Sequence, residues 1–177
     1  SLYEILICFI KVIFSIFIKV KKKNLDCNIL ILSHLVNINN FKSKNNIYFG
    51  KLEENLNKLG KTTTKYYLNH TNLKQSEISK YQIQILPKID SFKIEFEVLY
   101  NQIKLFTFSL SKIFYLYKKN NKLSLIIIFL LQTFSYHTQS ALRIGIQIKQ
   151  LIKGTNIKYI FMTFEGHCYE KIINLCN

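Results

Sequence analysis

Three short apolar runs constrain the fold more than any other feature of this 177-residue sequence. They read "CNILIL" at 27–32, "TTTKYYL" at 62–68 and "IKYIFMTF" at 157–164. Short runs rich in β-branched and aromatic residues are typical of strands, and those without polar alternation are typical of a buried parallel sheet. Helical periodicity lies between the runs. The sequence therefore predicts an α/β fold in which helices connect the strands.

The intervening segments predict three helices and one further short strand. We expect helices at 48–59, 93–118 and 122–153, with Gly60 and Gly154 ending the first and the last. The short strand is expected at 82–86. This order predicts a Rossmann-like, doubly wound, mostly parallel sheet with an inserted helical layer. The apolar start of the third helix, "LSLIIIFLL", is short for a bilayer span, so we interpret it as core.

The N-terminal segment 2–20 is strongly apolar and is followed by Lys21-Lys22-Lys23. Its polar residues recur every three or four positions, which places them in one narrow stripe along a helix: Glu4, Cys8, Lys11, Ser15, Lys19 and Lys22. A lysine near the centre of a span costs about 2.5–3.5 kcal/mol. We therefore expect a mostly buried amphipathic helix, with a helix lying on a membrane surface as the second interpretation. The expected domains are this helix (1–24) and a Rossmann-like domain (25–177).

The formal charge of +15 raises the question of nucleic-acid binding. Arg143 is the only arginine, however, and base contacts and phosphate clamps favour arginine. We expect the lysines to form a solvated face and expect no nucleic-acid partner, while attraction to an anionic membrane or to sugar phosphates stays open. The four cysteines match no zinc spacing, so we expect buried thiols, no metal and a reducing compartment. That compartment is the cytoplasm, with the inner face of the membrane as a peripheral location.

Three of the four histidines, His34, His70 and His167, follow predicted strands. If those strands are parallel, the three histidines share the carboxyl edge of the sheet, where doubly wound folds bind ligands. Ser33 and Asn69 adjoin them in the sequence. Histidine titrates near neutral pH, so acid–base or hydrogen-bonding roles are expected rather than metal binding.

Two glycines mark further candidate positions. Gly166, between Glu165 and His167, permits a tight turn before a predicted helix whose free N–H groups attract anions or hydroxyl groups. Glu165 could accept hydrogen bonds from a sugar or act as a base, and it could equally well only complement the helix start. Gly50 is either a second point at which a phosphate or another ligand can come close to the backbone, or an ordinary helix start. Neither a G-x-G-x-x-G nor a P-loop motif occurs, which disfavours dehydrogenases and P-loop NTPases.

Three segments resemble a known family: "ILILSHLVN", "IYFGKLEENLNKLGKTTTKYYLNHT" and "IKYIFMTFEGHCYEKII". They are similar to the N-terminal half of bacterial surface-carbohydrate (capsule and lipopolysaccharide) biosynthesis proteins, which resemble GT-B glycosyltransferases. In that family a strand ends in an acid–Gly–His turn, followed by an aromatic residue and a glutamate. The matching residues here are Glu165, Gly166, His167, Tyr169 and Glu170.

The resemblance implies sugar transfer from a nucleotide sugar to a glycan acceptor, with no cofactor. Glu165 or His167 would be the catalytic base. The expected substrate-binding residues are Ser33, His34, Gly50, Asn69, His70, Gly166 and Glu170. The second domain, which usually binds the nucleotide in this architecture, is not recognised, so we expect a fragment that holds the acceptor side. The alternative function is a non-enzymatic module that binds membrane or glycan through a basic surface.

Overall fold

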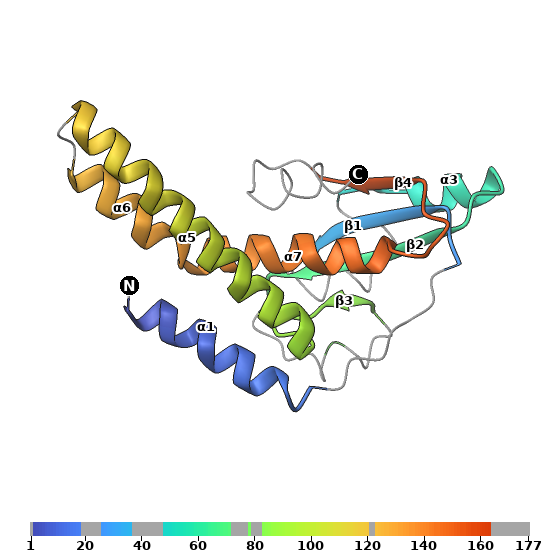
Figure 1. Ribbon diagram of the computed structural model, residues 1–177. Helices are drawn as coiled ribbons and strands as arrows, with labels where there is room; N and C mark the ends of the chain where they lie inside the picture. Colours follow the sequence, from blue (N-terminus) through green and yellow to red (C-terminus); the bar gives the residue numbers. More distant parts are fainter. Residues whose placement is uncertain are drawn as a thin grey trace. The chain divides into compact units, whose positions relative to one another are not determined.

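The computed structural model describes residues 2–18, 26–36, 48–71, 78, 83–120 and 123–163 (Figure 1). The chain divides into two compact units. The sheet unit comprises Lys22–Lys88 and Gln150–Gly166. The helical unit comprises Ser1–Lys21, Ile89–Lys149 and His167–Asn177.

The sheet unit contains four strands, all parallel, in the order β3-β2-β1-β4 (Figure 1). The strands are β1 (Ile29–Leu35), β2 (Thr63–Asn69), β3 (Ile85–Leu86) and β4 (Tyr159–Met162). This order is that of the first four strands of a Rossmann sheet. The predicted Rossmann-like α/β fold is therefore confirmed, although β1 extends beyond the predicted run and β3 is shorter than expected.

β1 forms the centre of this sheet. All seven of its residues are buried, as expected for a central parallel strand that is covered on both faces. Leu30 pairs with Thr64 of β2 on one side and with Ile160 of β4 on the other. Next to the strand end, Leu35 packs in a cluster with Tyr67 and Ile78. The uninterrupted "ILIL" run is thus the part of the sequence that fixes the core of this unit.

Helix α3 (Leu52–Lys58) lies between β1 and β2 in the chain and ends as predicted at Gly60. Gly60 has φ of 70°, the left-handed conformation that glycine adopts without strain. Its N–H donates to the carbonyl of Asn57 at 3.0 Å, and the N–H of Lys61 donates to that of Leu56 at 3.0 Å. This pair of bonds is a Schellman cap, which satisfies carbonyls left open by the helix end.

The helical unit consists of α1 (Leu2–Ser15), α5 (Phe92–Asn120), α6 (Leu123–Thr133) and most of α7 (Tyr136–Ile152). α5 packs against both α1 and α6 (Figure 1). Within the described residues, none of these helices combines the length and apolarity needed to cross a bilayer.

The single long helix expected at 122–153 is wrong, because the chain breaks between α6 and α7 at Phe134-Ser135. Ser135 begins the second helix in place of continuing the first. Its hydroxyl accepts a hydrogen bond from the N–H of Thr138 at 3.2 Å, the bond of a helix N-cap. Sequence periodicity did not indicate this break because Phe134, which is buried, keeps the apolar pattern running through it.

The expectation that α1 is mostly buried is also wrong. Its polar stripe faces inward, with Cys8 3% and Ser15 1% exposed. Its apolar side faces outward, with Tyr3 70% and Phe14 60% exposed. The start of α6, interpreted as core, likewise exposes Ile127, Ile128 and Leu131. Periodicity locates a polar stripe on a helix but does not indicate which side of the helix packs inward.

Candidate functional site

The strand order singles out one place on the sheet edge. From β1 the chain moves outward to β2 and β3, and it then returns to β4 on the opposite side of β1. Open parallel sheets bind ligands outside the carboxyl ends of their strands, at the point where the order reverses. Here those ends carry His34 on β1, His70 directly after β2 and Thr163 directly after β4.

The sheet register explains why the first two of these residues meet. His34 pairs with Leu68 of β2, and His70 lies two residues beyond Leu68. Side chains two residues apart on a strand lie on the same face, so both imidazoles project from one side of the sheet. The N–H of His70 also donates to the carbonyl of Leu35 at 3.1 Å, which extends the pairing past the strand end. The expected approach of these two strand-end histidines is confirmed.

The two imidazoles form a hydrogen-bonded pair. Nδ1 of His34 lies 2.8 Å from Nε2 of His70, and the rings stack with centroids 4.8 Å apart. Such a bond requires one nitrogen to carry the proton and the other to offer its lone pair. His34 is buried and His70 is exposed, so the pair connects a fixed interior ring to a ring that solvent can reach. The ring of Tyr48, 5.4 Å from His34 between centroids, adds an aromatic neighbour that the sequence did not single out.

Asn69 has a local structural role in the same region. Its Oδ1 accepts hydrogen bonds from the N–H of Thr71 at 2.9 Å and from the Thr71 hydroxyl at 2.7 Å. This Asx turn ends β2 and directs the chain away from the sheet. Lys88 supports the turn by donating to the carbonyl of Thr71 at 3.1 Å. The bonds of the Asn69 side chain thus shape the loop that carries His70.

Two other candidate residues do not belong to the histidine pair. Ser33 is fully buried, and strand alternation places it on the face of β1 opposite to His34. Gly50, two residues after Tyr48, has φ of 50°. Nothing lies within 4 Å of where a Cβ would sit, so its backbone conformation and not close packing requires glycine.

Thr163 is a second indication of a binding place at the carboxyl edge of the sheet. Its hydroxyl oxygen is buried, and no residue of the described part of the chain hydrogen-bonds to it. A buried hydroxyl without a partner costs about 1–3 kcal/mol, so such atoms often mark the place of a ligand or water. It follows directly after β4, at the point of the sheet where the strand order reverses.

The remaining predicted site residues, Glu165, Gly166, His167 and Glu170, lie outside the described residues. Their roles therefore stay predictions. Among the residues that the structure describes, no group of three or more histidine, cysteine, aspartate or glutamate side chains could hold a metal ion.

Comparisons of the chain with protein-family models, curated proteins and solved structures found no match. A functional argument for this chain consequently rests on its own geometry. The histidine pair at the reversal of strand order is the arrangement in the sheet unit with the clearest chemistry.

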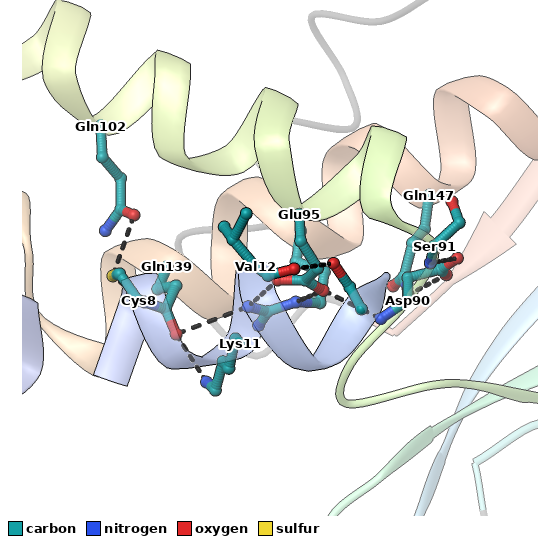
Figure 2. Close-up of polar contacts among 11 residues, drawn as sticks. Cys8, Lys11, Val12, Asp90, Ser91, Glu95, Gln102, Gln139 and Gln147 are labelled. Carbon is teal, nitrogen blue, oxygen red and sulfur yellow. Dashed lines mark hydrogen bonds and ion pairs between the residues drawn. The ribbon is translucent and has the colours of Figure 1, made fainter. Parts of the chain in front are cut away.

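The helical unit holds a second polar constellation, which the sequence did not indicate (Figure 2). At its centre Arg143 of α7 forms two bonds to Glu95 of α5, Nε to Oε1 at 2.6 Å and Nη2 to Oε2 at 2.8 Å. Glu95 Oε1 also accepts from the N–H of Asp90 at 2.9 Å, and Asp90 accepts from Gln147 at 2.7 Å. Both members of the ion pair are buried, so the bonds offset the cost of removing two charges from water.

The inward stripe of α1 extends this buried polar cluster. The thiol of Cys8 donates to Oε1 of Gln102 at 3.2 Å and accepts from Gln139, while Lys11 Nζ donates to Oε1 of Gln139 at 2.5 Å (Figure 2). Burial lowers the pKa of Lys11 to about 8, and the nearby Arg143 charge adds to this effect. Burial also raises the pKa of the Cys8 thiol, so it stays protonated at neutral pH.

The residues of this cluster form hydrogen bonds and an ion pair with one another. This pattern is typical of a network with a structural role. A signal in the sequence could have located its centre, because Arg143 is the only arginine of a chain that otherwise uses lysine. A planar guanidinium suits a buried two-point contact with a carboxylate better than an ammonium does. The partner Glu95, 48 residues away, could not be inferred from spacing.

Proposed function

We propose that this chain is the acceptor-side domain of a glycosyltransferase that transfers sugar from a nucleotide sugar to a surface glycan. The observation that carries the proposal is the hydrogen-bonded pair of His34 and His70 at the carboxyl edge of a parallel sheet of Rossmann order. This is the edge at which such sheets bind their ligands. The resemblance of the sequence segments around β1, β2 and β4 to surface-carbohydrate biosynthesis proteins supports the same assignment.

In this proposal the exposed His70 contacts the acceptor hydroxyl, while the buried His34 holds the ring of His70 in place through the 2.8 Å bond. An imidazole near neutral pH can accept the proton of a sugar hydroxyl as the new glycosidic bond forms. Glu165 and His167 remain candidates for the same step, since they follow β4 in the sequence. The nucleotide sugar supplies the activated sugar, and no cofactor takes part.

A transfer assay with the full-length protein tests the proposal. Labelled nucleotide sugars are offered together with glycan acceptors, and His70→Gln and Glu165→Gln are compared with the wild type. Removal of a general base is expected to lower kcat/KM by about 10²–10⁴-fold. His137→Gln is the matched control, because His137 is an exposed histidine that belongs to the helical unit and not to the histidine pair.

Binding is measured in parallel by NMR of the histidine side chains. Acceptor glycan is expected to shift the ring signals of His34 and His70 and to leave those of His137 unchanged. Undiminished transfer by both variants would remove these residues from the mechanism. Absence of transfer by the wild type, together with unshifted histidine signals, would contradict the proposed function itself.

A further inference from the structure

The outward face of α1, taken together with the turn that follows it to Phe17, is apolar without interruption. Every residue between Tyr3 and Phe17 that is classed as exposed is aliphatic or aromatic. These residues are Tyr3, Leu6, Phe9, Ile10, Ile13, Phe14, Ile16 and Phe17. The two charged residues of the helix, Glu4 and Lys11, are both partly buried. Surfaces that face water rarely expose a continuous apolar patch of this kind unless it binds something.

The inner side of α1 explains why this helix cannot simply rotate to hide its apolar face. Cys8 and Lys11 are held by Gln102 of α5 and Gln139 of α7. Rotation would expose the partners of a buried polar network and would leave its groups unsatisfied. The polar interior therefore fixes the apolar side of α1 outward.

We infer that the outward face of α1 docks on an anionic lipid surface, with the helix lying in the plane of the membrane interface. Aromatic and branched aliphatic side chains along one side of a helix are what enters the boundary between headgroups and acyl chains. The length of 14 residues suits a helix that lies on a bilayer and is too short for one that crosses it.

The charge of the chain favours this occupant over a second copy of the same chain. The net charge is +15, and in the sequence Lys19, Lys21, Lys22 and Lys23 follow closely after the apolar face. Basic residues next to an apolar segment are attracted to anionic headgroups. Two copies of such a basic chain would repel each other. Exposed lysines on α5, Lys93 and Lys104, belong to the same helical unit and add to the positive charge.

The chain contains no tryptophan, so a single introduced indole reports on its own position. Phe17→Trp places the reporter on the α1 face, and Leu59→Trp places it on an exposed residue of the sheet unit, 74% accessible. On vesicles that contain phosphatidylglycerol, the indole of Phe17→Trp is expected to shift its emission to the blue and to be quenched by brominated acyl chains. The indole of Leu59→Trp is expected to stay unquenched.

Loss of binding is measured by vesicle sedimentation. Replacing Phe14 and Phe17 together by serine is expected to lower partitioning at least about tenfold, because two aromatic rings that leave water in the wild type no longer do so. Leu59→Ser is the matched control and is expected to bind as the wild type does. Vesicles of phosphatidylcholine alone are expected to bind less protein, and added salt is expected to weaken binding to the anionic vesicles.

Three results would overturn the inference. Equal partitioning of the wild type and the double serine variant would show that this face does not contact lipid. A dimer that Phe17→Ser dissociates, without vesicle binding by the wild type, would assign the face to a second copy. A large loss of stability in Phe17→Ser without lipid would show that the face packs within the chain. None of these results depends on sugar transfer, so this inference and the proposed function can fail separately.

Discussion

The two units of this chain differ in how far they bury polar side chains. In the sheet unit the central strand β1 buries Ile29, Leu30, Ile31 and Leu32, as a parallel strand covered on both faces does. In the helical unit the buried positions include Glu95, Gln102, Gln139 and Arg143, while phenylalanine and isoleucine side chains are exposed. One chain thus uses apolar packing in one unit and a polar network together with apolar packing in the other.

The difference has an energetic consequence. Apolar burial contributes roughly 25 cal/mol per Å² whatever the orientation of the side chains, and it tolerates small changes of shape. A buried ion pair depends on geometry and on both partners, because each charge costs several kcal/mol to remove from water. The sheet unit should therefore lose stability in proportion to the apolar volume removed, whereas the helical unit should respond to the removal of single polar groups.

The largest effect is expected at the centre of the helical unit. Arg143→Met leaves the carboxylate of Glu95 buried without its two-point partner and should cost about 3–5 kcal/mol in the free energy of unfolding. Urea unfolding followed by circular dichroism measures this loss. The double variant with Glu95→Leu removes both charges and should recover most of it. A single variant as stable as the wild type would show that water reaches Glu95.

A smaller and more graded effect is expected in the sheet unit. Ile31→Ala empties a fully buried position of β1 and should cost about 2–5 kcal/mol, depending on how far the site relaxes. Ile13→Ala is the matched control, because Ile13 of α1 is exposed and its loss in water should change stability by less than about 0.5 kcal/mol. Equal losses at the two positions would show that burial in β1 does not determine the cost of losing an isoleucine side chain.

The sheet could be predicted because its signals are local. Short β-branched runs, separated by helical patterns and closed by Gly60 and Gly154, are sufficient to indicate a parallel sheet. The meeting of His34 and His70 followed from the same reasoning, since parallel strands present their carboxyl ends at one edge. Ser33 shows the limit of this reasoning. It lies next to His34 in the sequence, but strand alternation places its buried hydroxyl on the opposite face of β1.

The inverted arrangement of the helical unit could not be predicted, because it depends on contacts between distant residues. The polar stripe of α1 was visible in the sequence, but its partners Gln102 and Gln139 lie 94 and 131 residues from Cys8. A stripe of this kind fits a solvated side as well as a polar interior. Only the partners decide between these two arrangements, and a single sequence does not identify them.

The smallest of the stability effects concerns how Lys11 titrates inside the polar network. Burial lowers its pKa from 10.5 to about 8 in the folded chain. Between these pH values the unfolded chain holds a proton that the folded chain has lost, so the free energy of unfolding contributed by Lys11 rises with pH. The expected rise is about 1–2 kcal/mol, which is less than the full shift would give because the amine is partly exposed.

Two substitutions of Lys11 separate its contribution to the free energy of unfolding from the contributions of other groups that titrate in the same pH range. Cys8, whose pKa is raised by burial, acts in the opposite direction above its unfolded value of 9.0, so only differences between variants are informative. Lys11→Met is never charged and Lys11→Arg always is, and neither should show the rise. The wild type should resemble Lys11→Arg below about pH 8 and approach Lys11→Met as the pH nears 10.5. Parallel profiles for all three proteins would mean that Lys11 keeps its charge in water, and that the inner side of α1 is less closed than its contacts with Gln139 indicate.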